Sequence, residues 1–157
     1  MRAFVVCCAL ALSGCASPSP ARAQTTNGAI EICLSAAGPD HAERRACVGA
    51  ATDACIEGDD AMASTAGMVM CAQAERAQWA ALARSYAATL RARESATQRA
   101  MLEAMIAAQP QWAQARCAYA ASTYEGGSLA RYLGAACMRD AEAELALDLY
   151  ARLHDEN

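Results

Sequence analysis

Hydrophobic residues recur at helical spacing through most of the chain. In residues 64–93 the apolar positions lie three, four or eight residues apart, at Met68, Cys71, Trp79, Leu82, Tyr86 and Leu90. A second run follows the capping box that Ser95 forms with Gln98, and its apolar positions are Met101, Leu102, Met105 and Ile106. Positions three and four apart share one face of an α-helix, so these runs predict two long amphipathic helices.

The rest of the pattern is also helical. Pro110 is expected to kink the second long segment or to restart it. Strong helix formers then fill residues 113–122 and 129–149. No run alternates apolar and polar residues, and valine and isoleucine are scarce. We therefore predict an all-α fold, an antiparallel helical bundle of hairpins stapled by disulfides, with two short helices before two or three long ones.

Two cysteines lie symmetrically about a double glycine. Cys117 and Cys137 are each ten residues from Gly127. Gly126 or Gly127 can adopt the left-handed conformation that ends a helix, and Ser128 can cap the next one. This predicts a helical hairpin whose two arms are joined by a disulfide.

Four further cysteines flank two earlier breaks in the pattern. Cys33 and Cys47 are centred on Asp40, which we expect to form a capping box with Glu43. Cys55 and Cys71 are centred close to the break at Gly58-Asp59-Asp60. We expect Cys47 and Cys55 to share one helix, about 12 Å apart, which is too far for a bond between them. Six cysteines allow 15 connectivities, and symmetry favours 33–47, 55–71 and 117–137.

The N-terminal segment, residues 1–23, is typical of an export signal. Arg2 precedes an apolar run, residues 3–12, that is too short to span a membrane. Two cleavage sites compete: a lipobox-like sequence ending at the lipidation candidate Cys15, and a signal peptidase site after Ala23. We favour the lipoprotein. Both alternatives place the protein outside the cytoplasm, in the periplasm or as an outer-membrane lipoprotein, where six cysteines form disulfides.

Candidate catalytic chemistry is absent from the pattern. His41 and His154 have no cysteine at metal-ligand spacing, and we expect both to be surface residues. The acidic groups at Asp59-Asp60 and at residues 140–144 are more typical of helix starts and solvated faces than of a catalytic pair. We therefore predict a protein that is not an enzyme and that has no cofactor and no metal site.

The charge of the chain bears on which partners are suitable. Residues 24–157 carry 11 arginines against 17 acidic residues, a net charge of −6, with no lysine. Nucleic acid is a poor partner for an acidic chain, and we expect contact with a membrane only through a lipid anchor. A cationic protein suits such a chain, because opposite charges accelerate association, but from charge alone we favour the interpretation that acidity merely keeps an exported protein soluble.

The sequence Tyr124-Glu125-Gly126-Gly127-Ser128, placed between Cys117 and Cys137, resembles the LprI-type lysozyme inhibitor domain. The resemblance extends over residues 65–149 and includes Cys71, Leu82 with Tyr86, and Gln109 with Trp112 and Arg116. The chain departs from the family pattern at Trp79, Ala83 and Glu142, where the family usually has aspartate, asparagine and threonine, respectively. The family consists of small exported helical proteins with disulfides. We therefore divide the chain into the export signal, a helical extension (residues 24–63) and an LprI-like domain (residues 64–153).

The resemblance implies that the protein binds and blocks a lysozyme-like protein, and animal-type lysozymes are cationic. The turn from Tyr124 to Ser128, including Glu125, Gly126 and Gly127, has two interpretations. It is a helix stop and cap, or it is also a tip that enters a lysozyme cleft. The alternative function is an envelope protein–protein interaction module for another partner.

Overall fold

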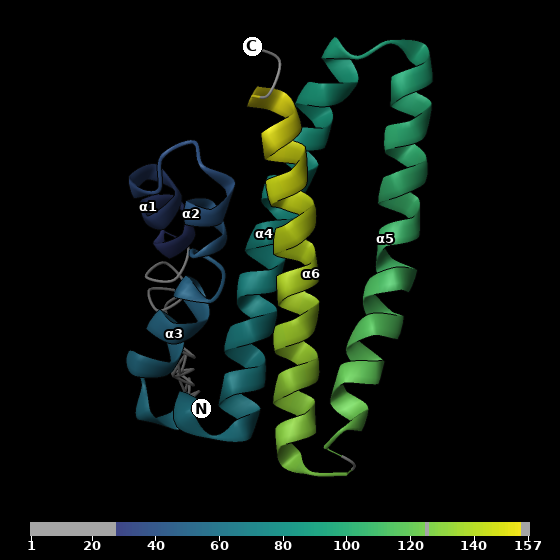
Figure 1. Ribbon diagram of the computed structural model, residues 1–157. Helices are drawn as coiled ribbons and strands as arrows, with labels where there is room; N and C mark the ends of the chain where they lie inside the picture. The colour runs from purple at the N-terminus through teal and green to yellow at the C-terminus, as the bar shows by residue number, and fades with distance from the viewer. Residues whose placement is uncertain (1–27, 125, 155–157) are drawn as a thin grey trace, which may run out of the picture.

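The computed structural model describes residues 28–124 and 126–154, and every regular element in these residues is helical. Three short helices, α1 (Ala29–Ala36), α2 (His41–Arg45) and α3 (Ala50–Glu57), precede the 3₁₀ helix η2 (Asp60–Ala63). Three long helices follow: α4 (Thr65–Arg93), α5 (Ala96–Ser122) and α6 (Ser128–His154). In Figure 1 the long helices run antiparallel, and the short helices lie on the side of α4 and α6 that faces away from α5. The predicted all-α fold is confirmed.

One helix predicted from the sequence is wrong. Cys47 and Cys55 do not share a helix, because residues 46–49 form a turn between α2 and α3. Gly49 has a φ of 106°, in the left-handed region that interrupts a helical path and favours glycine. The break explains why three short helices, rather than two, precede the long ones.

Side-chain caps fix several helix starts. Asp40 accepts the amides of Ala42 (2.8 Å) and Glu43 (3.0 Å), and Ser95 and Gln98 form the reciprocal capping box that the sequence predicted. Ser128 is the first residue of α6 rather than the residue before it. Pro110 lies inside α5, which continues to Ser122 without restarting.

Three disulfides join the pairs that symmetry favoured. Cys33 bonds to Cys47, Cys55 to Cys71 and Cys117 to Cys137, with Cα–Cα distances of 5.7, 5.7 and 5.5 Å. The first closes the α1–α2 segment, the second ties α3 to the start of α4, and the third ties α5 to α6. Two of the three bridges therefore involve the extension, and one of these two links it to α4.

The core lies between α4, α6 and the short helices. Trp79 is fully buried and is the largest such side chain, and small alanines around it let α4 and α6 approach closely. The extension adds Ile30, Leu34 and Ala51 to this cluster, whereas the buried residue that α5 adds to it is Leu102.

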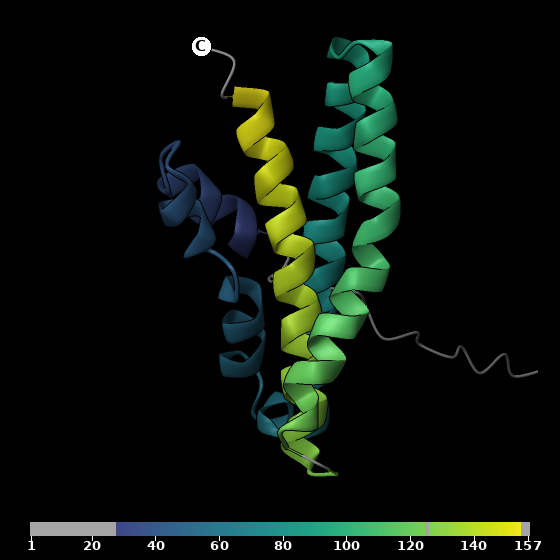
Figure 2. The same ribbon diagram turned by 45° about the vertical axis from the view of Figure 1, so that its right-hand side comes forward.

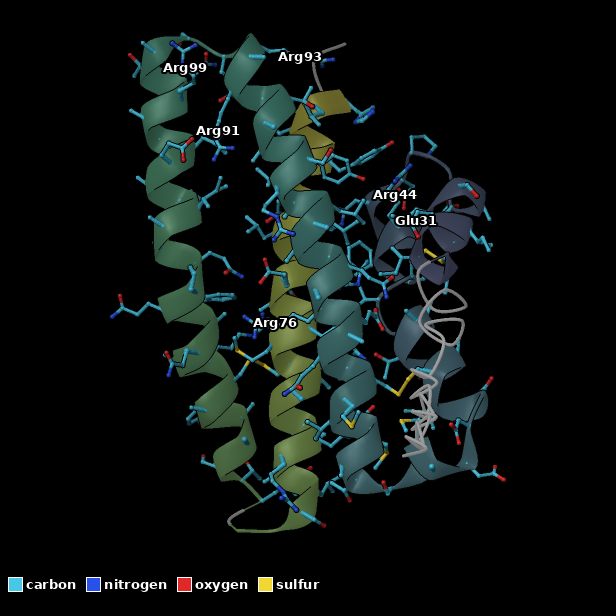
Figure 3. All side chains as sticks on the ribbon, turned by 180° about the vertical axis from the view of Figure 1, so that it is seen from behind. Glu31, Arg44, Arg76, Arg91, Arg93 and Arg99 are labelled. Carbon is cyan, nitrogen blue, oxygen red and sulfur yellow. A yellow bond between two sulfur atoms is a disulfide. The ribbon has the colours of Figure 1, made fainter. Side chains whose placement is uncertain are left out.

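Helix α5 is fastened near its two ends. Near its start, Glu103 pairs with Arg91 of α4, and Arg99 donates to the carbonyl of Glu94 at 3.0 Å. Figure 3 shows Arg91 and Arg99 together at this end of the α4–α5 hairpin. Near its other end is the Cys117–Cys137 disulfide. In Figure 2, which is turned by 45° from the view of Figure 1, α5 again lies at the edge of the bundle, beside α4 and α6.

Within the described residues, none of the helices combines the length and the apolar character needed to cross a lipid bilayer.

Candidate functional site

The turn between α5 and α6 forms the tip of the disulfide-bonded hairpin (Figure 1). The amide of Gly127 donates to the carbonyl of Tyr124, and the amide of Ala130 donates to the carbonyl of Gly127, both at 3.1 Å. Gly126 has a φ of 70°, the left-handed conformation expected of a glycine that ends a helix. Tyr124 is 47% exposed, while Glu125 lies outside the described residues. The turn thus presents an aromatic side chain to solvent beside a constrained backbone.

A stripe of polar and aromatic residues holds α5 against α6. Gln109 donates from Nε2 to the carbonyl oxygen of Ala141 at 3.0 Å. Arg116 donates from Nη1 to Oε2 of Glu144 at 2.6 Å, and its guanidinium lies 5.0 Å from the centre of the Trp112 ring. These three residues share one face of α5, so the Gln-x-x-Trp-x-x-x-Arg pattern positions the helix that leads into the turn.

Glu144 is the centre of an ion-pair cluster. Oε1 of Glu144 accepts Nη2 of Arg45 at 2.8 Å while Oε2 accepts Arg116, so one carboxylate connects α2, α5 and α6. Burial acts to raise the pKa of this carboxyl, but the hydrogen bonds from Arg116 and Arg45 outweigh burial and hold the pKa below its ordinary value. The hydrogen bond between Arg116 and Glu144 also raises the pKa of Arg116. Glu144 therefore acts as a charged anchor for α5.

A buried polar network connects the extension to the long helices, and sequence reasoning did not find it. Glu75 is fully buried and accepts the amide of Gly49 (2.7 Å), the amide and hydroxyl of Thr52 (2.7 and 2.6 Å) and Nε1 of Trp79 (2.9 Å). Arg139 of α6 donates to the Thr52 hydroxyl at 3.1 Å. The available signal was spacing: Glu75 is four residues from both Cys71 and Trp79, on the buried face of α4.

The other polar candidates are engaged in local contacts. Asp59 caps η2, Asp140 pairs with Arg139 at 2.7 Å, and Glu142 lies 3.7 Å from Arg76. His154 stacks on Tyr150 at 3.9 Å between ring centres. Among residues 28–124 and 126–154, no three His, Cys, Asp or Glu side chains gather in a way that could hold a metal ion.

The match to known families covers most of the described residues. The model of the family described as lysozyme inhibitor LprI matches residues 55–149, which include α4, α5, the turn and most of α6. No curated protein and no solved structure matches the chain. Since the matched segment exceeds half of the sequence, the chain belongs to the lysozyme inhibitor LprI family.

Proposed function

We propose that this protein is exported and that it binds and blocks a lysozyme-like protein without catalysing a reaction. The observation that carries the proposal is the family match over residues 55–149, because the family is one of inhibitors. The three disulfides fit export, since such bonds persist in oxidising compartments. The leader and Cys15, on which the lipoprotein alternative rests, lie outside the described residues.

The contact proposed for the partner is the turn from Tyr124 to Ser128. Tyr124 is exposed at the tip, and aromatic side chains give large contact area at a small loss of conformational entropy. The disulfide between Cys117 and Cys137 restricts the two helices that carry the turn, and a contact surface ordered before binding loses less entropy on association. The excess of acidic residues supports a cationic partner.

An inhibition assay tests the proposal. The mature, oxidised protein is titrated into a cationic animal-type lysozyme acting on a cell-wall suspension, and we expect lysis to slow in proportion to the protein added. Tyr124→Ala and Glu125→Ala should each weaken inhibition, whereas Ile32→Ser, at an exposed position of α1, should leave inhibition unchanged. Undiminished lysis at a large excess of the oxidised protein would refute the proposal and leave the interaction module for another envelope protein as the alternative.

A further inference from the structure

Two hollows adjoin each other along α5 and α6, apart from the turn and the buried network. The first has a volume of about 460 Å³ and apolar walls that include Met101, Leu102 and Leu149. The second has a volume of about 370 Å³ and includes Trp112 and Leu145. Met105 and Asp148 line both hollows, so we treat them as one surface and call it the α5/α6 groove.

The wall that α5 contributes is mainly apolar, and its apolar side chains are only partly covered by the rest of the protein. Met101, Met105 and Trp112 are 68%, 44% and 53% exposed, and they lie four and seven residues apart on one face of the helix. The stripe they form is about 17 Å long at the α-helical rise. Contiguous exposed apolar surface marks interaction sites, and methionine side chains adapt to the shape of an incoming partner.

Charge distinguishes between possible partners. Two arginines close to the groove already form ion pairs with carboxylates. Arg152 pairs with Glu94 at 3.2 Å, and Arg116 pairs with Glu144. Asp148 lies where the two hollows adjoin, and its side chain is 71% exposed. The ion-pair partner that the described residues give Asp148 is the imidazole of His41 at 3.9 Å, which is charged only when protonated. The groove therefore presents a carboxylate in the middle of an apolar surface.

We propose that the α5/α6 groove binds a basic amphipathic helix of a protein partner. The apolar face of that helix packs on Met101, Met105 and Trp112, and a lysine or arginine on its edge pairs with Asp148. Helices commonly bind in this way, with apolar anchors at intervals of three and four residues laid into a groove between helices. This site is separate from the Tyr124–Ser128 turn, so its occupant does not have to be a lysozyme-like protein.

Isothermal titration calorimetry with a defined probe tests the proposal. The probe is a helical peptide of about 14 residues, long enough for the stripe, with leucine on one face and lysine on the other. The matched control peptide has glutamate in place of every lysine. We expect the lysine peptide to bind the mature, oxidised protein in a one-to-one complex that weakens as salt is added, and the glutamate peptide to bind at least about tenfold more weakly.

Two variants and their matched controls locate the binding site. Asp148→Asn should weaken binding of the lysine peptide by about threefold to fivefold, as expected for one exposed ion pair. The double variant Met101→Ser/Met105→Ser should weaken it by about tenfold or more through lost apolar contact. Glu57→Gln on α3 and Met70→Ser on α4, which are exposed positions outside the groove, should leave the affinity unchanged.

Three results would overturn the proposal. They are equal affinity for the two peptides, unchanged affinity in both groove variants, and a dimer of the wild-type protein that Met101→Ser/Met105→Ser converts to a monomer. The third would assign the groove to a second copy of the chain. All the altered side chains are exposed, and Asp148→Asn keeps the test valid if the double variant folds poorly. Lysozyme inhibition, measured on the same variants, reports separately on the turn.

Discussion

Glu75 and Thr52 are 23 positions apart in the sequence and are joined by two hydrogen bonds to one carboxylate oxygen. Oε2 of Glu75 accepts both the amide and the hydroxyl of Thr52, at 2.7 and 2.6 Å, inside a fully buried site. Thr52 precedes the segment that matches the family, while Glu75 lies within it. Glu75 of α4 therefore anchors the extension to the long helices.

Glu75→Gln should destabilise the protein strongly. Each of the two carboxylate oxygens of Glu75 accepts two donors. In glutamine one of these oxygens is replaced by an NH₂ group, which would face two donors and leave them buried without an acceptor. We expect a loss of about 2–5 kcal/mol in the free energy of unfolding, measured with urea. Glu57→Gln at an exposed position of α3 is the control and should change stability by less than about 0.5 kcal/mol. Equal unfolding midpoints for the two variants would contradict the assigned role of Glu75.

Two glycines in long helices should respond in opposite ways to alanine. A Cβ at Gly67 would lie 2.4 Å from the Cα of Met62, so Gly67→Ala must push η2 away from α4. We expect it to destabilise the protein by about 1–3 kcal/mol. At Gly134 the nearest atom is 3.9 Å away, so Gly134→Ala should stabilise α6 by up to about 1 kcal/mol. Thermal unfolding of both variants checks the prediction, which fails if they shift the melting temperature in the same direction.

The disulfides could be predicted because each bridge closes a local hairpin. Cys117 and Cys137 lie at equal distances from Gly127, and helix geometry places such pairs level with each other across a turn. The same local reasoning failed for Cys47 and Cys55, because Gly49 adopts a left-handed conformation that breaks the helix between them. A distant residue also contacts this turn, since Glu75 accepts the Gly49 amide.

Sequence periodicity identified the apolar face of α5 but not how well it is covered. Met101 and Met105 have the spacing of core residues, yet they remain 68% and 44% exposed. Whether an apolar stripe is buried depends on the angle between helices, which is set by contacts far apart in the sequence. The groove therefore became apparent only in three dimensions.

As the pH falls, protonation of Glu144 should account for part of the loss in the free energy of unfolding. Its pKa is lower in the folded protein than the ordinary value of 4.5 because the hydrogen bonds from Arg116 and Arg45 outweigh burial. A carboxyl whose pKa is lower in the folded protein than in the unfolded protein stabilises the fold fully above the pKa of the unfolded state. This stabilisation is lost as the pH falls through the pKa of the folded state. Urea unfolding between about pH 7 and pH 3 should therefore show a smaller decrease in stability for Glu144→Gln than for the wild type. Glu57→Gln is the control, and parallel profiles for Glu144→Gln and the wild type would contradict the prediction.

Cys15→Ser should move the protein from the membrane fraction to the soluble fraction of the envelope. Cys15 ends the lipobox-like sequence, and two acyl chains anchor a protein to a bilayer far more firmly than one. Cell fractionation followed by N-terminal sequencing distinguishes the alternatives. A soluble wild-type protein beginning at Gln24 would favour cleavage by signal peptidase after Ala23.

The hairpin allows its role as a scaffold to be separated from its role as a binding site. Replacing Cys117 and Cys137 together by serine opens a loop with a sequence separation of 20, and loop-closure entropy puts the loss at about 3 kcal/mol. That is a large part of the roughly 5–15 kcal/mol that stabilises a typical domain, so the melting temperature should fall by several degrees. Tyr124→Ala and Glu125→Ala break no crosslink and should leave the melting temperature close to that of the wild type.

The two kinds of variant then give a clear comparison in the lysozyme inhibition assay. If the turn is the binding tip, Tyr124→Ala lowers inhibition while the fold remains intact, because the lost contact area belongs to the complex alone. If the turn is only a helix stop, both turn variants inhibit as well as the wild type. A double cysteine variant that melts at the wild-type temperature would show that the Cys117–Cys137 bond does not stabilise the hairpin. The rigidity on which the proposed tip depends would then need another source, for which the Arg116–Glu144 pair is the nearest candidate.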